Sequence, residues 1–93
     1  MDEDMRMFAQ LNAADQQRVL RLCRALASKD TNEAAWAFLV CRIAADATGK
    51  ARTVALLYVE DGLTWREVAE KTGLSKSYCH RLYKKAMKQV NAA

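Results

Sequence analysis

The 93-residue sequence has no proline, only three glycines and a single histidine. Proline and glycine interrupt helices and mark turns, so their scarcity favours helices joined by short connections. No stretch alternates between apolar and polar side chains for long enough to predict a strand. Apolar residues make up 52% of the chain, which is enough for a modest core in one small domain. We therefore predict an all-α fold with about five helices.

The three cysteines, Cys23, Cys41 and Cys79, are far apart and form no CxxC pair. With only one histidine present, they support neither a zinc site nor a disulfide framework. Each lies among apolar neighbours at helical spacing, so we expect three small buried side chains. We expect no metal, no cofactor and no enzymatic activity, because the sequence offers no nucleophile–base pair and no glycine-rich phosphate loop.

Long apolar runs are also missing. A membrane span needs roughly 20 apolar residues, and the most apolar stretch, 34–47, is broken by Arg42 and Asp46. The chain begins MDEDMRMF, which is acidic where a secretory signal is basic. The sequence thus predicts no membrane contact and a cytoplasmic location.

In the N-terminal half, the spacing of apolar residues and the capping residues predict helices. Residues 1–11 are expected to form a short helix or a frayed arm. Asn12, followed by Asp15, is typical of a cap for a helix that runs to about Ser28. The expected apolar face of that helix consists of Val19, Leu22, Cys23 and Leu26.

The next expected helix, from about 32 to 48, begins after a cap at Asp30 or Thr31 and ends at Gly49. It is apolar nearly all round, so it is either buried between two partners or faces another chain. This helix, with Trp36, Phe38 and Leu39, is therefore our candidate for a homodimer seam; the alternative is a monomer core.

The C-terminal segment has the pattern of a helix-turn-helix. A helix over 50–61 ends at Gly62, and Thr64 with Glu67 forms a T-x-x-E capping box. Gly73 then ends the short helix in a left-handed conformation, which glycine adopts without steric cost. Ser75 is expected to cap a last helix over about 76–91. Three groups of side chains give the motif its core: Trp65, Val68 and Ala69 on the first helix, Leu74 in the turn, and Cys79 and Leu82 on the second.

We predict one helical domain over 1–93. Residues 1–62 provide helical support and the candidate dimerisation region, and residues 63–93 form the helix-turn-helix. Charge follows the same division. Residues 1–62 carry eight bases and nine acids, whereas residues 63–93 carry seven bases and two acids, a net charge of +5. A basic surface on a helix-turn-helix is typical of a nucleic-acid-binding face.

The exposed positions of the recognition helix, about 76–90, give the candidate DNA contacts. Lysine and arginine pair with guanine edges in the major groove, and we expect base contacts from Lys76, Ser77, His80 and Arg81. We expect contacts with the DNA backbone from Thr64, Arg66, Ser75, Tyr78, Lys84, Lys85 and Lys88. Alternatives remain open, since Thr64 could serve only as a cap, Tyr78 could pack at the helix start and Arg81 could clamp a phosphate. Trp65 is assigned to the core.

The segment from about residue 52 to 90 resembles region four of bacterial primary sigma factors. Around Gly73-Leu74-Ser75-Lys76 it also resembles TrfB-type plasmid repressors. The sigma resemblance is carried by Leu63-Thr64, Glu67-Val68, Ser75-Lys76, Ala86 and Lys88. It implies that the base-reading face matches Lys76, Ser77, His80 and Arg81. Ser77 and His80 occupy positions where the sigma pattern has other residues. The DNA sequence that this protein binds should therefore differ from the promoter −35 element that sigma region four reads.

The sequence therefore predicts a sequence-specific regulator of transcription that binds double-stranded DNA, a repressor of the plasmid or phage type, acting as a homodimer. The alternative is a small helical module that binds RNA polymerase or another protein instead of DNA.

Overall fold

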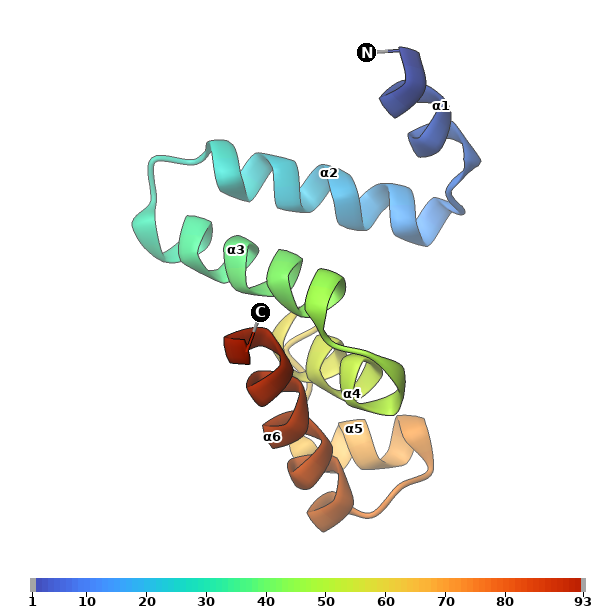
Figure 1. Ribbon diagram of the computed structural model, residues 1–93, viewed down its shortest axis with the longest axis vertical. Coiled ribbons are helices and arrows are strands. Elements are labelled where there is room, and N and C mark those ends of the chain that lie inside the picture. Colours follow the sequence, from blue (N-terminus) through green and yellow to red (C-terminus); the bar gives the residue numbers. More distant parts are fainter. Residues whose placement is uncertain (1, 93) are drawn as a thin grey trace. The chain divides into compact units, whose positions relative to one another are not determined.

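The computed structural model describes residues 2–92 and is built only from helices in that range (Figure 1). This confirms the all-α prediction. The alternatives for residues 1–11 resolve as a helix, which brings the total to six; Met1 and Ala93 lie outside the described residues. The helices are α1 (Asp2–Gln10), α2 (Ala13–Ala27), α3 (Thr31–Asp46), α4 (Gly49–Val59), α5 (Trp65–Thr72) and α6 (Lys76–Ala92).

The chain divides into two compact units, Met1–Phe38 and Leu39–Ala93, which we call unit 1 and unit 2. Unit 1 holds α1, α2 and the first half of α3. Unit 2 holds the rest of α3 and the three helices α4, α5 and α6, which pack against one another (Figure 1). The organisation as a single domain, with residues 1–62 as its support, stays a prediction.

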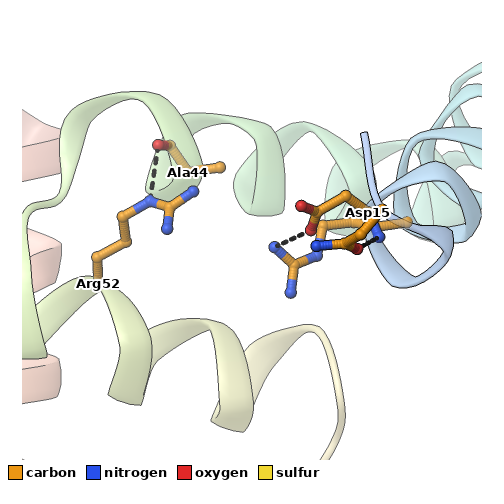
Figure 2. Close-up of polar contacts among 5 residues, drawn as sticks. Asp15, Ala44 and Arg52 are labelled. Carbon is orange, nitrogen blue, oxygen red and sulfur yellow. Dashed lines mark hydrogen bonds and ion pairs between the residues drawn. The ribbon is translucent and has the colours of Figure 1, made fainter. Parts of the chain in front are cut away.

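The predicted caps of unit 1 are present. The Asn12 side-chain oxygen accepts a hydrogen bond from the Asp15 amide at 2.8 Å, and the Asp15 carboxylate lies 3.8 Å from the Arg18 guanidinium (Figure 2). Asp30, one of two candidates, caps α3, because its carboxylate accepts from the amides of Asn32 and Glu33. Local sequence was sufficient for these helix starts, because these caps join residues only two or three positions apart.

The predicted apolar face of α2 was wrong. Leu22 is buried as expected, together with Ala25, but Val19, Cys23 and Leu26 are exposed. The physical reason is that α2 is apolar on two sides, and periodicity does not say which side turns inward. The expectation that all three cysteines are buried fails at Cys23, and holds fully only at Cys79.

Unit 2 has the larger core. Its largest fully buried side chains are Ile43, Val40, Val54, Val68 and Cys79. The later half of α3 therefore belongs to this core, whereas Phe38, before it, is 61% exposed.

The connection between α3 and α4 also differs from the prediction. Gly49 does not end α3, which stops at Asp46. It is instead the first residue of α4, with a positive φ of 60°.

Side-chain hydrogen bonds tie α3 and α4 to the end of α6. Arg42 donates to the Val90 carbonyl at 2.8 Å, and Thr48 and Gln89 exchange two hydrogen bonds of 3.1 Å. At the corner between α3 and α4, Arg52 Nε donates to the Ala44 carbonyl at 3.0 Å (Figure 2). The bonds of Arg42, Thr48 and Gln89 hold the C-terminal end of α6 against α3 and α4.

The turn of the helix-turn-helix has the predicted chemistry. Gly73 ends α5 in the left-handed region at φ 73°, and its amide donates to the Ala69 carbonyl. The Ser75 hydroxyl oxygen then accepts from the Tyr78 amide at 3.2 Å, which caps α6.

We expect Gly73→Ala to lower the free energy of unfolding by about 1–2 kcal/mol, because an L side chain is strained at positive φ. A Cβ at Gly73 would meet no atom within 4 Å, so the loss should come from backbone strain alone. Urea unfolding at 25 °C followed by circular dichroism measures the change. An unchanged midpoint would show that the turn does not need this conformation.

Candidate nucleic-acid interface

The N-terminus of α5 is fixed by a complete capping box. The Thr64 hydroxyl oxygen accepts from the Glu67 amide at 3.2 Å, and the Thr64 amide donates to the Glu67 carboxylate at 3.1 Å. Thr64 and Arg66 are both exposed at this end. The cap thus uses both the N–H and the hydroxyl oxygen of Thr64.

The hydrogen bond from the Thr64 amide is the main cause that lowers the pKa of the Glu67 carboxyl below its usual value, and the Thr64 side chain adds to it. A lowered pKa in the folded state stabilises the fold above the unfolded-state pKa, and this contribution disappears as the pH falls through the folded value. Wild type should therefore be more stable than Glu67→Gln at pH 7, and this difference should vanish in strongly acidic solution. Glutamine keeps an acceptor oxygen but does not titrate, so urea unfolding of both proteins across pH isolates the charge. A difference that persists at low pH would contradict the assignment.

One side of α6 is buried and the opposite side is free. Cys79, Leu82, Ala86 and Val90 are all at most 7% exposed and face the core of unit 2. With 3.6 residues per turn, the positions farthest from this side recur at i, i+4, i+7 and i+11. Four exposed residues occupy them, and we call this set the α6 stripe: Ser77, Arg81, Lys84 and Lys88.

An aromatic cluster borders one edge of the stripe. The rings of Tyr58 and Trp65 are stacked at 4.0 Å and 10°, and Tyr83 meets both of them edge-on. The exposed imidazole of His80 lies 5.1 Å from the indole of Trp65, at an angle of 65°. Trp65 is half-buried, so its assignment to the core is partly correct: it joins α4, α5 and α6 and also contacts a candidate base-reading residue.

The other predicted contacts lie around the stripe. Lys76 is exposed in the first turn of α6, on the same side as His80. Tyr78, 44% exposed, lies on the opposite edge together with Lys85, and Ser75 is exposed just before the helix. The structure therefore brings Lys76, Ser77, His80 and Arg81 onto one exposed surface near the start of α6, with Lys84 and Lys88 farther along.

The charge of this surface is not neutralised by the side chains that the structure describes. Among the described residues, no carboxylate forms an ion pair with the five cations of α6, which are Lys76, Arg81, Lys84, Lys85 and Lys88. Unpaired cations along one helix side attract a polyanion and exchange its counterions for fixed positive charge. Such a surface can bind phosphates along its length and present hydrogen-bond donors to base edges at one end.

Sequence reasoning missed the residues that hold this surface. The contacts of Arg42, Arg52 and the Thr48–Gln89 pair join positions 8 to 48 apart in the chain. Periodicity carries no signal for such pairs. The aromatic cluster could have been suspected, because Tyr83 lies between buried positions of α6.

Comparison with known proteins agrees with this geometry. Residues 52–89 match the family model of winged helix-turn-helix DNA-binding domains; the match takes in most of α4, all of α5 and most of α6, but less than half of the chain. No curated protein and no solved structure matches the chain. Residues 2–92, which the structure describes, contain no strand, so helices rather than a β wing carry the likeness. The likeness to sigma region four and to TrfB-type repressors is not shown. What is shown is that the chain carries, at residues 52–89, a segment of the helix-turn-helix DNA-binding type.

Proposed function

We propose that this protein binds double-stranded DNA in a sequence-specific manner by placing α6 in the major groove. The α6 stripe supports this most directly. The stripe lies opposite the buried side of α6, which follows the capped helix α5 and the left-handed turn at Gly73. Its cations have no acidic partner among the described residues. In helix-turn-helix proteins the N-terminal end of the second helix contacts base edges, and the rest contacts the backbone.

The positions along α6 suggest separate roles. Arg81 reads a guanine, since it lies near the start of the helix and its guanidinium can pair with two acceptors of the base. Lys76, Ser77 and His80 contact neighbouring bases. Lys84, Lys85 and Lys88 hold phosphates farther along, and Tyr78, Ser75, Arg66 and Thr64 contact the backbone beside the groove.

In this proposal the protein regulates transcription as a repressor of the plasmid or phage type, and it acts as a homodimer. A two-fold dimer places two recognition helices on an inverted repeat whose half-sites are separated by one or more helical turns, about 10 base pairs each. Occupation of such a site within a promoter would exclude RNA polymerase.

Selection of binding sites from random duplex DNA, followed by footprinting, tests this proposal. We expect one recurring motif, with binding to the selected duplex much stronger than to a scrambled duplex of the same composition. Recovery of no motif, together with equal weak binding to both duplexes, would contradict it.

A second candidate function is binding of a protein partner such as RNA polymerase. One feature favours it: an open groove of about 390 Å³ between α4 and α5 has apolar walls from Val54, Leu57 and Leu74, with Lys50 and Lys71 at the rim. The same selection separates the two functions, because a protein-binding module would show no sequence preference for DNA.

A further inference from the structure

The groove between α4 and α5 has the size and the walls of a small-molecule site. Its volume of about 390 Å³ lies within the range of roughly 300–1,000 Å³ that is typical of ligand pockets. Val54, which is 1% exposed, lies at its floor, and the half-buried Leu57 and Leu74 form its apolar walls. Leu74 belongs to the turn after α5, so α4, α5 and this turn all contribute to the groove. Walls of this composition fit the apolar part of a small ligand.

The charged residues that line the groove are both cations. Lys50 lies in the first turn of α4 and Lys71 in the last turn of α5, and both are exposed. Among the described residues, no carboxylate forms an ion pair with either of them. Two other hollows in the same part of the chain differ in this respect, since one contains Glu33 and the other Glu67 and Glu70. The charge of the groove therefore complements an anion.

The two hydroxyl groups of the groove are already engaged. The Thr53 hydroxyl donates to the Gly49 carbonyl at 3.4 Å, and the Thr72 hydroxyl donates to the Val68 carbonyl at 2.7 Å. The Thr72 oxygen also accepts from the Leu74 amide at 3.4 Å. The side-chain donors left for a ligand are therefore the two lysine ammonium groups.

The start of α4 adds to the attraction for an anion. The cap residue Thr48 makes no side-chain bond to the first-turn amides of α4, because its hydroxyl accepts a hydrogen bond from the Gln89 amide group instead. Helix starts carry partial positive charge and bind anions through such free amides. Lys50 lies in this turn, so its ammonium group and the helix start favour the same negative charge.

We propose that the groove binds a small amphiphilic carboxylate. Its hydrocarbon part lies against Val54, Leu57 and Leu74, and its carboxylate pairs with Lys50 and Lys71. A small molecule fits better than the protein segment considered above, because a helix in a groove needs a row of anchors over two turns, whereas three apolar side chains match one short hydrocarbon group. The inference goes beyond DNA binding and does not depend on it.

Three probes with the same hydrocarbon chain separate the contributions of charge and apolar contact: octanoate, 1-octanol and octylammonium. Methyl NMR spectra of the labelled wild-type protein follow each titration. Octanoate should shift the methyl signals of Val54, Leu57 and Leu74 in a saturable manner. It should bind about tenfold more tightly than 1-octanol, because two exposed ion pairs and a helix start each contribute a few-fold. Octylammonium should bind most weakly, because its charge opposes the two lysines.

A matched pair of variants tests the lysines. Lys50→Gln/Lys71→Gln removes both charges, and Lys50→Arg/Lys71→Arg keeps them at the same exposed positions. The glutamine variant should bind octanoate about tenfold more weakly than wild type and bind 1-octanol equally well, whereas the arginine variant should keep most of the octanoate affinity. Circular dichroism reports whether each variant is folded, and the comparison of the three probes on wild type does not depend on any variant.

Several results would overturn the proposal. These are no saturable shift of the groove methyls at millimolar octanoate, equal binding of the three probes, and unchanged octanoate affinity in the glutamine variant. Shifts confined to the exposed Val19, Leu20 and Leu26 of α2 would also overturn it, since they would indicate unspecific apolar adsorption. A protein that binds octanoate in the groove but prefers no DNA sequence would refute the DNA function alone, and the reverse would refute the ligand site alone.

Discussion

Replacement of Arg81 by alanine should weaken binding to the selected duplex by about 1–3 kcal/mol, or roughly 5- to 150-fold, and should relax the preference at one base pair. The expected loss is large because Arg81 lies on the exposed α6 stripe, opposite Cys79 and Leu82, where α6 would enter the groove. A bidentate pair between arginine and guanine has no equivalent on a scrambled duplex. Fluorescence anisotropy on both duplexes at fixed salt measures the two affinities.

Lys84→Ala is the matched control, since it removes one charge from the same stripe one turn farther along. It should weaken binding to both duplexes alike and reduce the slope of log affinity against log salt by about one unit. If Arg81→Ala also weakens binding to both duplexes alike, Arg81 contacts only a phosphate, and the base contacts must come from Lys76, Ser77 or His80.

Trp65→Ala should lower the free energy of unfolding by about 2–3 kcal/mol, somewhat less than the loss for a fully buried tryptophan. The indole stacks on Tyr58 at 4.0 Å and contacts Tyr83 and His80, so it joins α4 and α5 to the recognition helix. Trp65→Phe keeps a ring at this position and should lose less than half as much. Urea unfolding of the three proteins tests the order, and equal stability of wild type and Trp65→Ala would show that the cluster does not hold the helices.

The local features of the fold could be predicted from sequence. Asn12, Thr64 with Glu67, and Gly73 act on residues within four positions, and all of them have the predicted geometry. The buried side of α6 was also predictable, because Cys79 and Leu82 recur at helical spacing among cations. These are the features that place Arg81 and the lysines on one surface.

The errors arise where the sequence allows two answers. The α2 helix has apolar residues on the Leu22 side and on the Cys23 side, and periodicity does not choose between them. The α3 helix is apolar all round, and its burial changes from Phe38, which is exposed, to Val40, which is not. Which side of a helix is covered depends on partners far away in the chain. The hydrogen bond from the Arg42 guanidinium to the Val90 carbonyl is an example of such a contact.

The most direct test of the central claim is an NMR titration of the labelled protein with the selected duplex. We predict that the largest chemical-shift changes fall on the α6 stripe and at the start of α5, and that Arg81 and Ser77 show contacts with protons of the major groove. A scrambled duplex should give only weak, salt-sensitive changes near Lys84 and Lys88. Changes confined to the groove between α4 and α5, with α6 unaffected, would contradict the account.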